Sequence, residues 1–301
     1  MSIDTPVEVS LERRRKGFLQ RFLGAVLRFA QTKPIGFFGA IVIVVALITG
    51  VFAPQIARQG YNKTDIAHTM EGPSLKYWFG TDQLGRDLFS RMVWGARVSV
   101  IIGFSVITLA TLLSLSIGAV AAFVGGRYDD IVLRFVDAFL TFPTLVITLT
   151  LVAILGQSVL TIIAVLSFSS GIHQCRITRS AVLAIKSNQY MEAARAIGAS
   201  PARIFAVYVL PNIFPIVIIL ATAALGGVIL AEASLSFLGF GVPPPQPTWG
   251  GMLTGASAHY MTENFWLALW PGLALSLVVY AANMLGDALR DVMDPRLRGS
   301  R

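Results

Sequence analysis

Six long apolar stretches constrain the fold of this chain more than any other feature of its sequence. A helix needs about 20 predominantly apolar residues to cross the hydrocarbon core of a bilayer, and each stretch reaches that length. We therefore predict six transmembrane helices, which the sequence places at about 35–56, 98–124, 131–155, 158–180, 212–235 and 264–287.

The composition excludes the main alternatives to a membrane protein. Charged residues make up 13% of the chain and hydrophobic residues 55%, whereas about 25% of the residues of a soluble domain are charged. A disordered chain would be poor in apolar residues. The single cysteine, Cys175, excludes a disulfide framework and a cysteine-rich zinc site. The sequence thus predicts an all-α integral membrane protein.

Basic residues indicate how the helices are oriented, because cytoplasmic segments carry an excess of lysine and arginine. Of the 24 lysines and arginines, 18 fall in the two tails and around 125–134 and 176–211, and the other six fall in loop 57–97. Six spans place both tails on one side of the membrane. We therefore predict that both termini are cytoplasmic, and the basic pI reflects a membrane and its lipids rather than nucleic acid.

The connection 188–212 (NQYMEAARAIGASPARIFAVYVLPN) has the pattern of two short helices joined by a turn. Gly198 suits the left-handed residue that ends a helix. Ser200 and Pro201 suit the N-cap and the first position of the next helix, and Pro211 is expected to end it. Residues at helical spacing give each helix an apolar face: Met191, Ala194 and Ile197 in the first, Ile204, Phe205 and Tyr208 in the second. Two unpaired apolar faces predict docking into a groove of another protein.

This connection resembles the coupling loop of ABC importer permeases, in which E-A-A is followed by a glycine six residues after the glutamate and then by Leu-Pro. The matching residues are Glu192, Ala193, Ala194, Gly198, Leu210 and Pro211. Tyr208 departs from the family, which often has an aliphatic residue there. Segments 80–97, 232–253 and 283–297 resemble the peptide and nickel subgroup, and most closely its second permease subunit.

The resemblance implies a type I importer transmembrane domain in the inner membrane of a bacterium. Its expected organisation is a cytoplasmic amphipathic basic tail (1–34), a first transmembrane helix (35–56), a periplasmic loop (57–97), a permease core with five transmembrane helices (98–290) that contains coupling loop 188–212, and a cytoplasmic tail (291–301). Segment 80–87 is expected to form a tight turn on the outer face, within reach of the binding protein.

The implied partners are a homologous second permease subunit in a heterodimer, two ATP-binding subunits and a periplasmic or lipid-anchored substrate-binding protein. ATP and Mg²⁺ would be bound by the ATP-binding subunits, with no cofactor in this chain. The sequence agrees with this division, because it has no G-x-x-x-x-G-K-[ST] phosphate loop. Peptides are the expected substrates, and glutathione, nickel complexes or another small solute remain alternatives.

Two other functions fit the sequence less well. A stand-alone secondary transporter usually shows internal repeats and paired broken helices, and neither pattern is found. An intramembrane enzyme needs paired catalytic groups at membrane depth, but the three histidines, His68, His173 and His259, are scattered. We assign no catalytic residue and no metal ligand.

Polar residues inside the spans are candidates for the path or a gate, because such residues are costly in a membrane. Arg134 and Asp137 lie one helical turn apart, which suits either a local ion pair or a gate. Pro143 is expected to kink the third span. Glu232, near the outer end of the fifth span, is expected either to contact a substrate amine or the binding protein, or to pack against the backbone of an outer loop.

Overall fold

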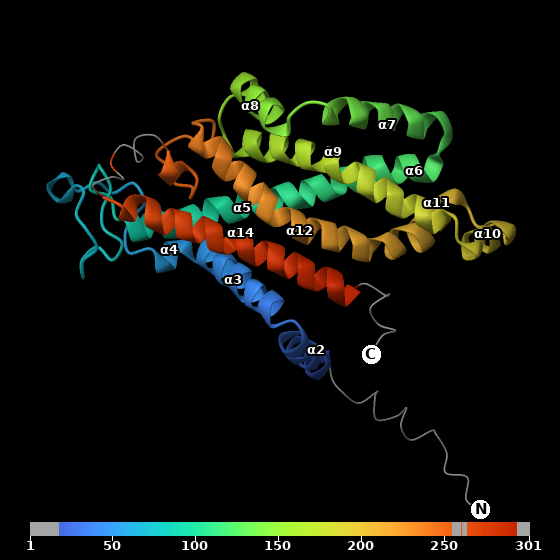
Figure 1. Cartoon of the computed structure of the whole chain (residues 1–301), viewed down its shortest axis with the longest axis horizontal. Helices are drawn as coiled ribbons and strands as arrows, with labels where there is room; N and C mark the ends of the chain where they lie inside the picture. The colour runs from blue at the N-terminus through green and yellow to red at the C-terminus, as the bar shows by residue number, and fades with distance from the viewer. Residues whose placement is uncertain (1–17, 255–259, 261–263, 294–301) are drawn as a thin grey trace, which may run out of the picture.

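The computed structural model describes residues 18–254, 260 and 264–293. In this part of the chain every regular element is a helix or a single helical turn. Figure 1 shows the long helices side by side along the long axis of the molecule. The first 17 residues of the expected basic tail, and the end of the carboxyl-terminal tail from residue 294, lie outside the described residues.

The α-helices are α2 (Phe18–Thr32), α3 (Pro34–Val51), α4 (Ala53–Ile56), α5 (Leu88–Leu113), α6 (Val120–Val124), α7 (Gly126–Leu140), α8 (Thr144–Leu155), α9 (Val159–Lys186), α10 (Gln189–Ala196), α11 (Pro201–Ile204), α12 (Leu210–Phe237) and α14 (Trp266–Met293). The long α-helices run along the bundle, whereas α2 and α8 run in other directions (Figure 1). The 3-10 turns are η1 (Ile66–His68) and η4 (Gly251–Leu253), and the π-helical turns are η2 (Ser114–Ala119) and η3 (Phe205–Val209).

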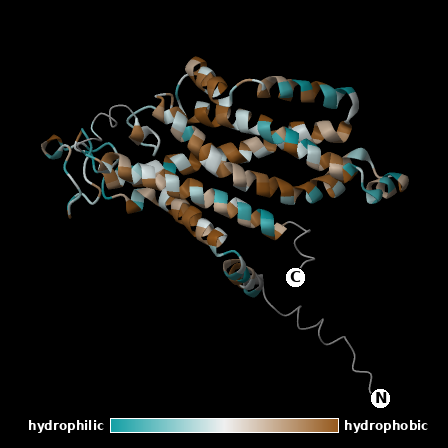
Figure 2. Cartoon of the chain, in the orientation of Figure 1, coloured by the Kyte–Doolittle hydropathy of each residue, from teal (hydrophilic) through white to brown (hydrophobic). Residues whose placement is uncertain are grey.

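Five of the predicted spans are confirmed as helices long and apolar enough to cross a membrane. They are Pro34–Val51, Leu88–Val124, Val159–Lys186, Pro201–Phe237 and Trp266–Met293. Apolar residues follow the long helices in Figure 2, and hydrophilic residues gather on α7, on α10 and in the loops at the opposite end. This distribution is what a bilayer around the middle of the bundle requires.

The third span differs from the prediction of one kinked helix over 131–155. The structure has two helices there, α7 and α8, which are bent by 90° to each other at a break of three residues. Pro143 directly precedes α8. Proline donates no backbone hydrogen bond and disfavours helical backbone in the residue before it. The expected kink is therefore a complete break between two helices. The chain has a sixth span only if α7 and α8 are counted together as one span.

Two helix boundaries also differ from the prediction. Helix α5 begins at Leu88 rather than near 98, because the Asp87 side chain accepts a hydrogen bond from the Ser90 backbone N–H (3.0 Å) and caps the helix. Pro211 was predicted to end the second short helix, and this is wrong: helical backbone continues from Pro201 to Phe237. The π-helical turn η3 directly precedes Pro211, and such wide turns are a usual way to accommodate a break in the hydrogen-bond ladder.

The core of the bundle lies between α3, α5, α9, α12 and α14. Buried residues of α3, α5, α12 and α14 form one cluster, and those of α5, α9 and α12 form another. Helix α9 packs closely against η2, where a Cβ added to Gly118 would lie 2.7 Å from the Cys175 carbonyl oxygen. This contact therefore requires glycine, and it fixes the carboxyl-terminal half of α9 beside the second span.

Candidate functional site

The predicted coupling loop forms a projection at one end of the bundle. We call residues 188–212 the coupling segment; it contains α10, α11, η3 and the first turn of α12. Figure 1 shows α10 and α11 at one end of the bundle, and the loop between α4 and α5 at the other. The coupling segment is therefore well separated from the outer loops along the long axis.

The turn between α10 and α11 has the geometry that the sequence predicted. Gly198 has a φ of +80°. Its N–H donates to the Arg195 carbonyl (2.9 Å), and the Ala199 N–H donates to the Ala194 carbonyl (3.1 Å). This pair of bonds is the Schellman motif that ends a helix. The Ser200 hydroxyl then accepts from the Arg203 N–H (3.4 Å), and Pro201 occupies the first turn of α11.

The apolar faces of the two short helices are largely covered, which corrects the prediction that they are unpaired. Met191 is fully buried, and Ala194 and Ile204 are 3% exposed. They pack in one cluster with the ends of the neighbouring helices: Ala119, Ala122, Ala181, Val182, Val209, Ile213 and Val217. The segment therefore packs on its own chain through this face, and only the opposite side is free to contact another protein.

That opposite side presents a mixed polar and apolar surface. Glu192 and Ala193 are exposed, and the structure gives the Glu192 carboxylate no hydrogen-bond or ion-pair partner among the described residues. Ile197 is 78% exposed, unlike Met191 and Ala194, with which it was predicted to share an apolar face, and Tyr190 is 41% exposed. A free carboxylate beside exposed apolar side chains can bind a complementary groove of another protein.

The end of the coupling segment borders an apolar hollow. Leu210 and Pro211 line a cavity of about 320 Å³ together with Leu115, Ile213 and Phe214. The matching Leu-Pro of the predicted motif thus lies where the segment joins the membrane-spanning part of α12. Any movement of the coupling segment would be transmitted to the fifth span here, because the helix is continuous from Pro201.

The predicted ion pair between Arg134 and Asp137 is not present. Asp137 instead forms an ion pair with Arg176 of α9. Arg134 is exposed, and none of the described residues forms a hydrogen bond or an ion pair with its side chain. Both residues lie on α7, but they point to different surroundings. They therefore do not act as a pair, and a gate made of the two residues together has no support in this conformation.

Sequence reasoning missed a second link between α7 and α9. The Arg179 guanidinium donates from Nε and Nη2 to the two carboxylate oxygens of Asp129, at 2.8 and 2.7 Å. Two parallel bonds of this kind give both strength and a fixed geometry. The sequence shows only two opposite charges, 50 residues apart. That separation does not reveal which residues form an ion pair.

Glu232 is buried near the carboxyl-terminal end of α12, with 1% of its surface exposed. It accepts a hydrogen bond from the Ser236 hydroxyl (2.8 Å) and lies 3.5 Å from the Ser99 hydroxyl of α5. A hydrogen bond also links it to the Thr248 side chain in the loop after α12. Glu232 therefore lies against that loop, as one alternative predicted, but its hydrogen-bond partners are side chains and not the loop backbone. Glu232 does not meet Arg134, Asp137 or Pro143, so the four candidate path residues form no common site.

Comparison with known proteins agrees with this architecture. The family described as "Binding-protein-dependent transport system inner membrane component" matches residues 114–299, which include the whole coupling segment. The dipeptide transport system permease protein DppC of Alkalihalophilus pseudofirmus is 36% identical over 260 residues, which are 86% of this chain and 85% of that protein.

Two further relatives extend the match to nearly the full length. The oligopeptide transport system permease protein OppC of Bacillus subtilis is 34% identical, over 95% of this chain and 93% of its own. The probable D,D-dipeptide transport system permease protein DdpC of Escherichia coli is 33% identical, over 93% of this chain and 94% of its own. Together with the all-helical bundle, these matches show that the chain belongs to the inner membrane components of binding-protein-dependent transport systems, the membrane domains of type I ABC importers.

Proposed function

We propose that this protein is the non-catalytic permease subunit of an ATP-driven importer for short peptides, and that it forms half of the translocation path. The observation that carries this proposal is the coupling segment. It is anchored on the ends of the spans by Met191 and Ile204, and its outward face, around Glu192, is free to contact another protein.

The energy for transport must then come from other subunits. The sequence contains no G-x-x-x-x-G-K-[ST] phosphate loop. We propose that two ATP-binding subunits hold ATP and Mg²⁺, that a homologous second permease completes the path, and that an external substrate-binding protein delivers the substrate. Peptides are favoured because the relatives are a dipeptide, an oligopeptide and a D,D-dipeptide permease by name. Glutathione, nickel complexes or another small solute fit the same architecture.

Reconstitution tests this function. The complete transporter in proteoliposomes should take up a radiolabelled dipeptide only with ATP, its binding protein and both permeases present. The same chain purified alone should hydrolyse no ATP above the empty-liposome background, because it has no phosphate loop. ATP hydrolysis by the clean single subunit, or uptake without ATP, would contradict the proposal. Uptake of glutathione or a nickel complex but no peptide would change only the substrate.

The proposed orientation places the coupling segment in the cytoplasm and both termini on that side. Cysteine introduced at Ser200 should react with a membrane-impermeant maleimide only after the cells are opened, whereas cysteine at Gln246 should react in intact cells. Both positions are exposed. The native Cys175 is 2% exposed, so the wild-type protein supplies the background. Labelling of both positions from one side would contradict the orientation.

A further inference from the structure

The outer end of the bundle contains a polar cavity of about 290 Å³ that none of the functions above uses. Its exposed rim consists of Gln157, Gly239 and the segment 244–246, and its buried floor includes Asp82, Arg86 and Arg91. These three are the charged residues that line it. We call this cavity the outer pocket. It brings together the turn before α5 and the loop after α12, which are far apart in the sequence.

Asp82 is fully engaged by the residues around it. Its Oδ1 accepts from the backbone N–H groups of Leu84 (2.9 Å) and Arg86 (3.0 Å). Its Oδ2 lies 2.7 Å from Nε of Arg86 and 3.4 Å from Nε of Arg91. A carboxylate offers about four acceptor positions, so Asp82 has no capacity left for the outer nitrogens of either guanidinium group.

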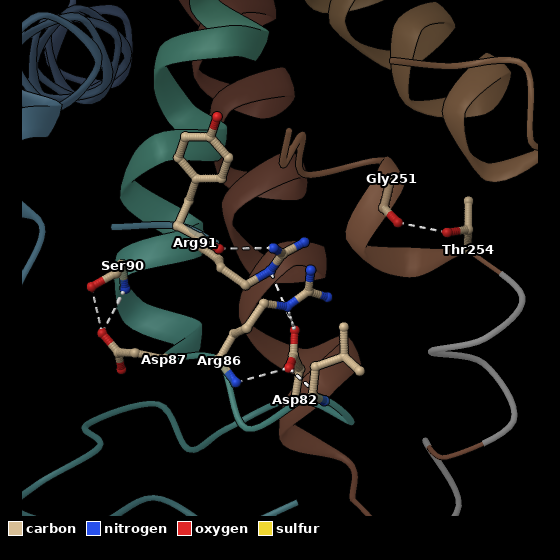
Figure 3. A network of polar contacts seen from close by, with 9 residues as sticks. Asp82, Arg86, Asp87, Ser90, Arg91, Gly251 and Thr254 are labelled. Carbon is tan, nitrogen blue, oxygen red and sulfur yellow. Dashed lines mark hydrogen bonds and ion pairs between the residues drawn. The ribbon is translucent and has the colours of Figure 1, made fainter. Parts of the chain in front are cut away.

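Two arginines therefore share one carboxylate in a largely buried site. The side chains of Arg86 and Arg91 are 10% and 11% exposed. Of their outer nitrogens, Nη1 of Arg91 donates to the Tyr61 carbonyl at 3.1 Å, and the others donate to no other described residue. Figure 3 shows the two guanidinium groups next to each other beside Asp82, with Asp87 turned away towards Ser90. The outer pocket thus carries one excess positive charge.

An excess buried charge favours an anion of matching geometry. Burying an unpaired charge is costly, and a guanidinium group binds a carboxylate through two parallel hydrogen bonds. The volume of the outer pocket is at the lower limit of small-molecule sites, which suits a single side chain rather than a whole peptide. The charge and the size of the site therefore favour a single carboxylate side chain.

The position of the outer pocket indicates which molecule carries that carboxylate. The pocket is lined by the turn before α5, the first turns of α5 and the loop after α12. These segments lie at the end of the bundle opposite α10 (Figure 1), which the proposed orientation places outside the cell. A path must release what it carries, and two adjacent buried arginines would hold the carboxylate of a passing peptide too tightly. A docked protein has no such requirement, and arginine is frequent among the residues that contribute most to protein interfaces.

We propose that the outer pocket is a docking socket that receives one Asp or Glu side chain of the external substrate-binding protein, with Arg86 and Arg91 as its two anchors. The inference rests on the proposed function, because it requires a binding protein as partner. It adds the residues that hold that partner and the chemistry of the group they hold.

The test is the affinity of the complete transporter in nanodiscs for its fluorescently labelled binding protein. Removing one partner of a buried hydrogen-bonded charge pair costs a large part of the binding free energy. Arg86→Gln and Arg91→Gln should therefore each raise the Kd for the binding protein by about thirtyfold or more. Lys63→Gln is the matched control: it removes the same charge from an exposed position of the same loop, outside the pocket. It should change Kd by less than about twofold.

A second measurement keeps the proposal testable if an arginine variant fails to assemble. Gln246→Glu adds a carboxylate at the exposed rim and leaves the buried network intact; it should also weaken binding, and Gln246→Ala should not. In addition, acetate should weaken binding to the wild type more than chloride does at equal ionic strength. The Gln246→Glu variant should copurify with all the other subunits, which shows that the complex is intact.

The possible results separate the alternatives. Wild-type affinity in both arginine variants and in Gln246→Glu would overturn the inference alone, whereas a wild-type transporter that does not bind or respond to the binding protein would overturn the proposed function as well. The socket would also be excluded if the arginine variants change only the uptake of peptides with a free carboxyl terminus, compared with amidated peptides.

Discussion

Gly198→Val is expected to reduce substrate uptake by whole cells by about tenfold or more, at a near-normal level of the subunit in the membrane. Gly198 has a φ of +80°, and an added Cβ would meet nothing within 4 Å. The penalty therefore comes from the backbone and not from a clash. Left-handed backbone costs a residue with a Cβ roughly 1–2 kcal/mol, and a β-branched residue more. Because every 1.4 kcal/mol is about tenfold, the turn would lose much of its docking geometry.

Asparagine is the matched control at this position, because it tolerates left-handed backbone better than other residues with a Cβ. Gly198→Asn should retain most of the uptake, with Gly198→Ala between the two variants. Uptake is measured with a radiolabelled dipeptide and divided by the amount of subunit on an immunoblot. Equal uptake by the Asn and Val variants would show that the left-handed turn has no part in transport.

Asp129→Ala is expected to destabilise the folded subunit strongly, because it leaves Arg179 without its bidentate partner. The side chains are 9% and 25% exposed. Removing one partner of a buried pair costs about 3–5 kcal/mol, and the partial exposure of Arg179 places this variant at the lower end. Helix α7 would then lose one of its two ion pairs to α9 and should detach more easily. The thermal unfolding temperature of the purified subunit in detergent checks this expectation.

The neighbouring Asp130 supplies the control, because it is exposed and carries the same charge on the same helix. Asp130→Ala should leave the unfolding temperature within error of the wild type. The exchanged pair Asp129→Arg with Arg179→Asp should recover part of the lost stability, since opposite charges meet again. Equal effects of Asp129→Ala and Asp130→Ala would contradict a structural role for the ion pair.

Local features of the fold could be predicted from the sequence. Five spans follow from apolar length, and the turn at Gly198 follows from residues within a few positions of each other. Gly198, Ser200 and Pro201 all have conformational preferences that act in the unfolded chain as well. The N-cap at Asp87 is also a local preference and could have been predicted. The start of α5 was instead placed at the beginning of the long apolar stretch, near residue 98.

Features that depend on tertiary contacts could not be predicted. Asp137 has a basic residue one turn away, yet it pairs with Arg176 of another helix. Pro143 indicated a kink, but its 90° extent depends on how α7 and α8 pack. The sequence identified the apolar faces of α10 and α11. It did not show that residues of η2, α6, α9 and α12 pack against them. Likewise, Asp82 and Arg86 are four residues apart, but the outer pocket also needs the loop after α12.

The central claim is that the outward face of the coupling segment contacts an ATP-binding subunit, and site-specific photo-cross-linking tests it most directly. A photoreactive phenylalanine analogue replaces Tyr190, which is 41% exposed on α10, or Leu75, which is 96% exposed in the outer loop. In the assembled transporter, the analogue at position 190 should capture an ATP-binding subunit, and the analogue at position 75 should not. Capture from neither position, although the ATP-binding subunits copurify with the chain, would show that they dock elsewhere and would contradict the account.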